Sequence, residues 1–135
     1  MKSIALLVLL TGCPLSNGGD GECKRDEDCG GSEVCARDSS CALPADIRQV
    51  DVTWTIRGAA ASVMTCGAFP DLYLSFIGND SSDTLGFSPV PCRIGQFTID
   101  KLPTRFRQVE LGVEGGTRDF APISTAGTAA LDLSL

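Results

Sequence analysis

The sequence predicts a mainly β protein, in which a single antiparallel β-sandwich of about six or seven strands follows a small cysteine-rich segment held by disulfides. Short stretches of alternating apolar and polar residues recur from residue 46 to residue 135. Four of the seven cysteines lie between Cys23 and Cys41, each separated from the next by five residues. The composition, 43% hydrophobic and 21% charged, is that of a globular protein.

The first twelve residues predict a signal peptide. Lys2 supplies a positive charge, and the seven residues from Ile4 to Leu10 are all apolar. A helix of that length spans only about 10 Å, against a hydrocarbon core of ~30 Å, so this run is too short to cross a membrane. The other interpretation is a buried N-terminal strand or helix, which the order of charge, apolar run and small residues disfavours.

Residues Leu10 to Cys13 read LTGC, which resembles the lipobox of bacterial lipoproteins. The resemblance implies that the chain is cleaved before Cys13, that the Cys13 sulfur carries diacylglycerol and that the new amino group is acylated. The partner that it implies is therefore a membrane, reached through the lipid anchor at Cys13. Pro14 in place of an aspartate points to the outer membrane of a bacterial envelope, on its periplasmic face or at the cell surface.

Residues 13–22 are rich in Gly and polar residues and predict a flexible tether, after which residues 23–42 form the cysteine-rich module. With Cys13 set aside, six cysteines remain, and an even number in an exported chain predicts disulfides. Zinc is the weaker interpretation, because its ligands usually come as C-x₂₋₄-C pairs and thiolates oxidise outside the cytoplasm. Four clustered cysteines allow three connectivities, and their spacing alone does not choose among them.

The module resembles the short cysteine-rich repeats of Dickkopf-like proteins, on the residues Cys23, Asp26, Asp28, Cys29, Val34, Cys35 and Cys41. This resemblance implies the pairs Cys23–Cys35 and Cys29–Cys41, and it implies no activity.

Two clusters of carboxylates suggest cation sites. Asp26, Glu27 and Asp28 are ligand types that calcium prefers, but no D-x-D-x-D-G loop is present, and we favour a solvated acidic face. In the loop 78–83, turn chemistry accounts equally well for Asn79, Asp80 and Asp83.

The β-sandwich domain is predicted over residues 46–135. Residues 50–56 alternate without a break, which places Val50, Val52, Trp54 and Ile56 on one buried face and makes Trp54 a core residue rather than an exposed stacking platform. Residues 59–66 favour one or two helical turns. The remaining expected segments are a central strand at 71–77, an edge strand at 85–90, a short strand at 96–99, a turn at 102–104 and strands at 106–113, 120–124 and 128–133.

Cys66 and Cys92 are the remaining cysteine pair. Twenty-five residues separate them, and closing such a loop contributes roughly 3 kcal/mol in the chain-entropy model. Because no C-x-x-C pair is present, we expect this disulfide to be structural rather than catalytic.

The stretch from Gly95 to Val113 resembles the core of carboxypeptidase-regulatory-like and other transthyretin-like sandwich domains. The resemblance lies in Gly95, Phe97, Ile99, Leu102, Pro103, Val109 and Leu111. It departs from the family pattern after Pro103, where Thr104 and Arg105 replace the usual Gly-Tyr. Domains of this kind are mostly noncatalytic spacers, folding aids or binding modules, and that is what the resemblance implies here.

The composition also limits function. The chain has no histidine, which removes the usual general base, the Ser-His-Asp and Cys-His arrangements and the commonest metal ligand. A net charge of −6 makes nucleic acid an unfavourable partner. Arg93, Arg105 and Arg107 suggest a basic patch, but charges that protect a solvated sheet edge are the favoured interpretation.

The expected function is therefore that of a noncatalytic, envelope-anchored lipoprotein, acting as a binding or structural module toward a protein or another envelope component. We expect no enzyme activity, no cofactor and no metal. The alternatives are a small-ligand or glycan-binding sandwich and, behind it, a carboxylate-based hydrolase.

Overall fold

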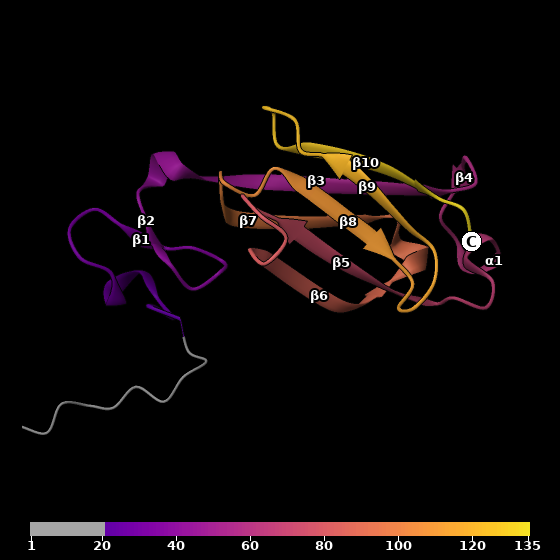
Figure 1. Ribbon diagram of the computed structural model, residues 1–135, viewed down its shortest axis with the longest axis horizontal. Helices are drawn as coiled ribbons and strands as arrows, with labels where there is room; N and C mark the ends of the chain where they lie inside the picture. The colour runs from indigo at the N-terminus through magenta and orange to yellow at the C-terminus, as the bar shows by residue number, and fades with distance from the viewer. Residues whose placement is uncertain (1–20) are drawn as a thin grey trace, which may run out of the picture.

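The computed structural model describes residues 21–135. The predicted signal peptide, the lipidation site Cys13 and nearly all of the tether lie outside these residues. In the described part, the cysteine-rich module occupies one end of an elongated molecule and the β-sandwich the rest (Figure 1). The module contains a 3₁₀ turn, η1 (Asp26–Asp28), and a short antiparallel hairpin of β1 (Val34–Cys35) and β2 (Cys41–Ala42).

Two four-stranded sheets form the sandwich, which confirms the predicted fold class. In the first sheet, β3 (Ile47–Ile56) pairs with β7 (Gln96–Pro103), β4 (Ala59–Ala60) and β10 (Thr128–Leu133). The second sheet has the order β6 (Thr84–Pro91), β5 (Asp71–Ile77), β8 (Gln108–Gly112) and β9 (Arg118–Pro122).

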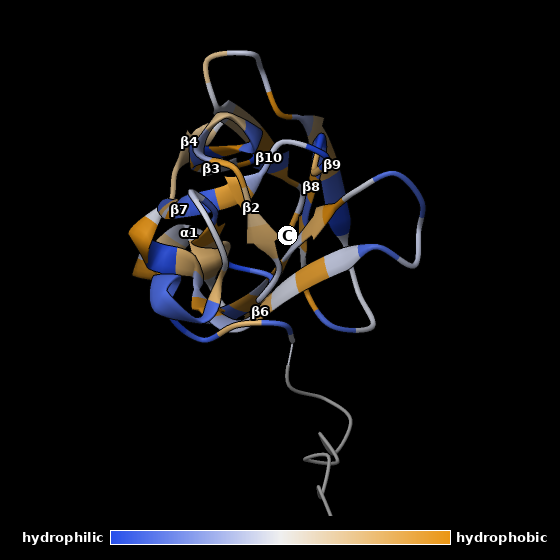
Figure 2. Cartoon of the chain, turned by 90° about the vertical axis from the view of Figure 1, so that its left-hand side faces the viewer, coloured by the Kyte–Doolittle hydropathy of each residue, from blue (hydrophilic) through white to orange (hydrophobic). Residues whose placement is uncertain are grey.

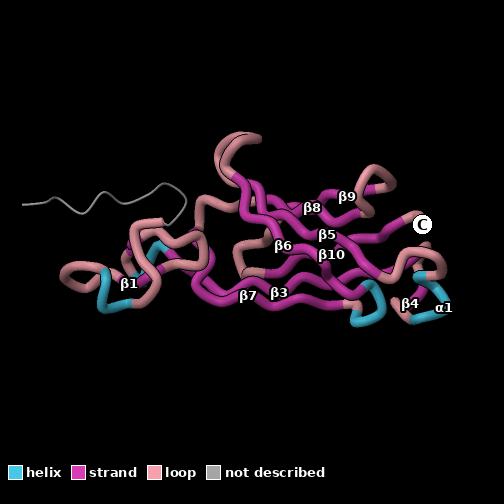
Figure 3. Tube along the Cα trace, turned by 90° about the horizontal axis from the view of Figure 1, so that it is seen from below, coloured by secondary structure: helices cyan, strands magenta, loops and turns pink. Residues whose placement is uncertain are grey.

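Three short helical segments complete the described chain: η2 (Pro44–Asp46), α1 (Val63–Cys66) and η3 (Cys92–Ile94). The strands run along the long axis of the molecule, and the helical segments lie toward its two ends (Figure 3). No helix within residues 21–135 is long and apolar enough to cross a membrane.

The core lies between the inner faces of the two sheets. Val50, Val52, Trp54 and Ile56 of β3 are all buried, and Trp54 is only 4% exposed, as its place in the alternating pattern predicts. Apolar and polar residues alternate along the strands (Figure 2). Three phenylalanine rings from β5, β6 and β7 pack together, with centroids 5.0–6.4 Å apart; they are Phe76, Phe87 and Phe97.

The last strand is parallel to its neighbour, whereas the other strand pairs are antiparallel. β10 lies on the side of β3 opposite β7, with Thr128 beside Asp51 and Leu133 beside Ile56. The chain leaves β9 in one sheet and enters β10 in the other, and this crossing brings it alongside β3 in the same direction. The antiparallel sandwich of the prediction thus carries one parallel pair.

Local boundaries differ from the sequence prediction where turns intervene. Arg57 and Gly58 have φ angles of 49° and 74°, so the chain doubles back and Ala59–Ala60 pair with β3 instead of starting a helix. The helix is only the four residues of α1. β7 continues through Pro103, and the turn follows at residues 104–106, where the Phe106 N–H donates to the Pro103 carbonyl. β8 therefore begins at Gln108 rather than at Phe106.

Candidate functional site

The described cysteines are all paired. The structure joins Cys23 to Cys35 and Cys29 to Cys41, which is the pairing that the Dickkopf-like resemblance implies, and it joins Cys66 to Cys92. Each bridge spans 5.6–6.1 Å between Cα atoms, an ordinary separation for a disulfide. Within residues 21–135, the one cluster of three potential metal ligands consists of the sulfur atoms of Cys23, Cys29 and Cys41, all of which are in these bridges.

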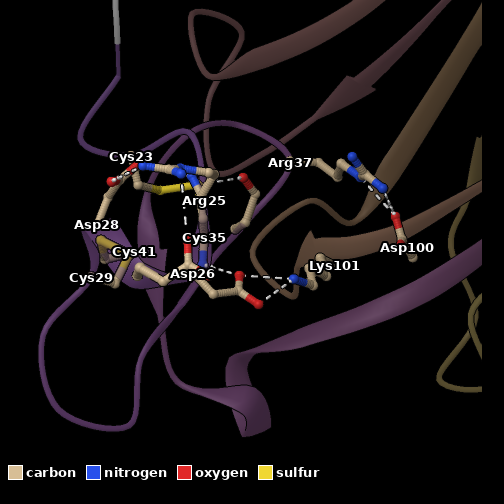
Figure 4. A network of polar contacts seen from close by, with 12 residues as sticks. Cys23, Arg25, Asp26, Asp28, Cys29, Cys35, Arg37, Cys41, Asp100 and Lys101 are labelled. Atoms are coloured by element: carbon tan, nitrogen blue, oxygen red, sulfur yellow. Dashed lines mark hydrogen bonds and ion pairs between the residues drawn. A yellow bond between two sulfur atoms is a disulfide. The ribbon is translucent and has the colours of Figure 1, made fainter.

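The acidic residues of the module serve its own backbone. Asp28 accepts hydrogen bonds from the backbone N–H groups of Lys24 and Arg25, both at 2.9 Å, and these bonds close the η1 turn (Figure 4). Asp26 accepts a bond from the backbone N–H of Cys35 at 3.0 Å. Such bonds stabilise the charged form, and they lower the pKa of Asp28. Two of the three carboxylates considered for calcium thus already have donors from the protein.

The module is fastened to the sandwich by ion pairs. Lys101 Nζ lies 2.8 Å from Asp26 Oδ1, and Arg37 forms an ion pair with Asp100 (Figure 4). The Arg37 N–H also donates to the Lys101 carbonyl at 3.1 Å, so the module covers part of the outer edge of β7. A polar cleft of about 410 Å³ separates the two parts here.

A third contact between module and sandwich is more buried. Arg105 bonds Asp38 of the module through Nη2 and Asp83 of the β5–β6 loop through Nε, the latter at 2.9 Å. Burial alone would raise the pKa of Asp38, but hydrogen bonds from Ser40 and Arg105 outweigh it and hold the pKa below its ordinary value. Asp80 accepts bonds from Ser82 in the same loop, which lower its pKa.

The three arginines considered as a basic patch do not come together. Arg105 is engaged with carboxylates at the module end, whereas Arg93 lines a cleft beside Cys66 and Val63 at the far end of the sandwich. Arg107 is exposed and lies just before β8. Sequence spacing placed Arg105 and Arg107 near each other, but it carried no information on the 3₁₀ segment that holds Arg93.

The outer face of the second sheet carries a hollow that is lined largely by polar residues. We call it the sheet-face groove; it measures about 670 Å³ and is lined by Tyr73, Ser75, Gly86, Ser88, Glu110 and Glu114. Its floor is open because Gly86 projects no side chain, and a Cβ added there would meet nothing within 4 Å.

Tyr73 and Glu110 form the polar centre of the sheet-face groove. The Tyr73 hydroxyl donates to the Glu110 carboxylate, and Arg118 Nη1 lies 3.6 Å from the same carboxylate. Partial burial and the bond to Glu110 raise the pKa of Tyr73, so its hydroxyl stays protonated and can donate. Phe120 lies on the neighbouring strand β9, directly beside Glu110, and its ring centroid is 5.5 Å from the Arg118 guanidinium. The groove therefore presents an aromatic ring, hydroxyl groups and a carboxylate whose position is fixed by Tyr73 and Arg118.

The sequence did not single out this groove. Strand alternation puts Tyr73 and Ser75 on the face opposite Leu72 and Leu74, but the register that sets Glu110 beside Ser75 joins residues 35 positions apart. Trp54 lies in the core, as predicted, and its Nε1–H donates to the Cys92 carbonyl at 2.9 Å.

Comparisons with known proteins give no match: no protein-family model, no curated protein and no solved structure resembles this chain at a significant level.

Proposed function

We propose that the protein is a noncatalytic lipoprotein of the bacterial envelope, anchored through Cys13, with its β-sandwich acting as a binding module. The observation that carries the proposal is the pairing of the cysteines. Of the seven in the sequence, six form disulfides with one another, which leaves Cys13 as the one thiol free for lipidation. Disulfides are typical of exported proteins, and the lipobox-like LTGC ends at that cysteine.

Three features of the described chain support a binding role rather than catalysis. The sequence lacks histidine. Asp38, whose side chain is only 11% exposed, pairs with Arg105 and so holds the module to the sandwich. The Dickkopf-like and transthyretin-like resemblances belong to this proposal as well, and both imply modules that bind or space other components.

Metabolic labelling tests the anchor. The full chain and its Cys13→Ser variant are expressed in a bacterium fed an alkyne fatty acid, and label and membrane association are then measured. We expect the native chain to take up label and sediment with the envelope, and the variant to lose both. A Leu15→Ala variant is the matched control and should behave like the native chain. Equal labelling of the native and Cys13→Ser chains would rule out this anchor.

The sheet-face groove favours a second candidate, a glycan-binding module. Saccharides are bound by aromatic faces together with planar polar groups, and Tyr73, Glu110 and Arg118 supply both. We expect binding on a glycan array that Tyr73→Ala abolishes, while Gln49→Ala on the other sheet leaves it unchanged. An array without signal, or signal indifferent to Tyr73→Ala, would exclude this role.

A further inference from the structure

The end of the sandwich opposite the cysteine-rich module gathers exposed apolar side chains. Within residues 21–135, four of the six exposed large apolar residues belong to α1, to η3 or to the segment that follows α1. α1 lies at the end of the sandwich away from the module (Figure 1). We call this set the apolar tip: Val63 (70% exposed), Met64 (91%), Phe69 (41%) and Ile94 (48%).

The backbone beneath the apolar tip is firmly held. The Cys66–Cys92 disulfide ties α1 to η3, and both cysteines are buried. Ser62 caps α1, since its Oγ accepts the Thr65 N–H at 3.1 Å and the Thr65 hydroxyl accepts the Ser62 N–H at 2.8 Å. The Met64 side chain therefore projects into solvent from a helical turn whose backbone is held in place.

Two arginines flank the apolar tip. Arg57 lines a shallow cleft of about 310 Å³ together with Met64, and Arg93 lines one of about 260 Å³ together with Val63. Neither guanidinium pairs with a carboxylate of the described chain.

The acidic groups at this end are few. Asp71 lies in the same cleft as Arg93, and Asp132 accepts bonds from the Thr55 hydroxyl and the Gly58 N–H. Asp119 accepts the Asp132 N–H at 3.0 Å. The formal charges of Arg57, Arg93, Asp71, Asp119 and Asp132 therefore sum to −1, whereas the chain as a whole carries −6. The tip therefore carries only a small part of the acidic excess of the chain, and that excess would repel an anionic surface.

We propose that the apolar tip docks on a phospholipid surface, with its apolar side chains in the interfacial region and with Arg57 and Arg93 on headgroup phosphates. A stable protein interface takes roughly 20–30 residues a side, far more than this patch offers. Association with a lipid surface requires only that a few apolar side chains insert to a shallow depth, and it does not require a partner of complementary shape. Guanidinium groups bind phosphate oxygens in pairs of hydrogen bonds.

The inference goes beyond the proposed anchor and does not depend on it. Where Cys13 is acylated, the tip supplies a second contact at the other end of the molecule, and two linked contacts hold a surface far better than either one.

Tryptophan reporters test the docking without interference from the N-terminal residues. Met64→Trp places the reporter on the tip, and Phe120→Trp places a matched one beside the sheet-face groove; the native chain, whose one tryptophan is buried, gives the baseline. Each full chain also carries Cys13→Ser and is mixed with vesicles of phosphatidylcholine and phosphatidylglycerol that contain a brominated phosphatidylcholine. We expect the emission of the Met64→Trp chain to shift to the blue and to be quenched by bromine, and that of the Phe120→Trp chain to do neither.

The arginines are tested in the Met64→Trp chain. Arg57→Gln and Arg93→Gln should each weaken partitioning roughly five-fold, because one cation near an anionic surface contributes about 1 kcal/mol. Arg107→Gln, an exposed arginine away from the tip, should leave it unchanged.

Three outcomes would overturn the proposal. The first two are no quenching at position 64 and equal quenching at positions 64 and 120. The third is a native chain that does not bind vesicles but self-associates in sedimentation, with Met64→Asp abolishing the self-association. The last result would assign the tip to a second copy of the chain. Failure of fatty-acid labelling at Cys13 would leave the tip measurement unaffected, so the two proposals fail separately.

Discussion

Arg105 joins three parts of the molecule through one side chain. It bonds Asp38 in the module and Asp83 in the β5–β6 loop, and its guanidinium lies 4.5 Å from the centre of the Phe106 ring. Phe106 is itself almost fully buried. A planar group with several fixed donors can serve two carboxylates and a ring at once, whereas a lysine ammonium cannot.

Truncation of Arg105 should therefore destabilise the fold. We expect Arg105→Ala to lower the free energy of unfolding by about 1–2 kcal/mol, since it leaves the mostly buried Asp38 without its cation. Arg105→Lys should recover only part of this loss. Urea unfolding followed by Trp54 fluorescence measures both variants. Arg107→Ala, at an exposed neighbour, should stay within about 0.5 kcal/mol of the native chain, and a loss there as large as that of Arg105→Ala would contradict the assignment.

The same contact predicts a loss of stability in acid. The folded-state pKa of Asp38 lies below the ordinary value for an aspartate. Its contribution to stability is therefore present above that ordinary value and disappears as the pH falls through the lower, folded pKa. Asp26 and Asp100, which face Lys101 and Arg37, have lowered pKa values as well and act in the same direction. The urea midpoint should therefore fall as the pH drops below about 4.

Asp38→Asn provides the matching control for the acid effect. This variant should be less stable than the native chain at pH 7, and its stability should depend less on pH below 4. Parallel pH profiles for the two chains would show that Asp38 is not the responsible group.

At the scale of elements, the turn before β10 sets the parallel pairing with β3. Gly127 has a φ of 77°, and its carbonyl accepts the Asp51 N–H at 2.8 Å. A Cβ built on Gly127 would lie 2.3 Å from the Gln49 carbonyl oxygen, so the turn can approach β3 only because this residue is glycine.

Gly127→Ala should accordingly cost about 3 kcal/mol or more, from backbone strain and from the clash with β3 together. Gly115→Ala is the matched comparison, because Gly115 has a similar φ of 71° but nothing within 4 Å of an added Cβ. Gly115→Ala should lower the free energy of unfolding by the backbone strain alone, about 1–2 kcal/mol. Thermal or urea unfolding separates the two, and equal losses would show that the close approach to Gln49 does not matter.

The elements show which parts of the structure were predictable from sequence. Uninterrupted alternation from Val50 to Ile56 identified β3 and its buried face, because a half-buried strand needs that period. The pattern at 128–133 matched β10 as well, but alternation says nothing of a strand's partner or direction, so the parallel pairing was not predicted. Residues 59–66 were expected to form one or two helical turns. One turn forms at Val63–Cys66, whereas the Arg57–Gly58 turn pairs Ala59 with Ile56.

The candidate site was less predictable, because its contacts join distant residues. Lys101 meets Asp26 across 75 positions, and Tyr73 meets Glu110 across 37. Only the sheet register and the docking of the module bring them together.

At the scale of the whole molecule, the module and the sandwich are stabilised by different means. The module buries only Cys23 and Ala36 among its apolar residues, so its disulfides take the place of a core. The sandwich has a continuous apolar core between its sheets.

Removal of single disulfides should separate the two parts. Cys23→Ser with Cys35→Ser should open residues 21–42 to proteases and leave the melting of the sandwich nearly unchanged. Cys66→Ala with Cys92→Ala should instead lower the free energy of unfolding of the sandwich by roughly 3 kcal/mol and leave the module resistant. Limited proteolysis and Trp54 fluorescence monitor the two parts. Simultaneous loss of both signals in the first variant would show that module and sandwich unfold as one unit.

The pairing of β3 with β10 also bears on the order of folding. Asp51 and Thr128 are neighbours in the first sheet although they lie 77 positions apart in the sequence. Contacts of such long range make folding slow, because the chain must close a large loop before it gains the contact. During synthesis, one side of β3 stays without its neighbour until β10 has left the ribosome. The first sheet can therefore reach its full width only after residues 128–133 have been made and have paired with residues 51–56.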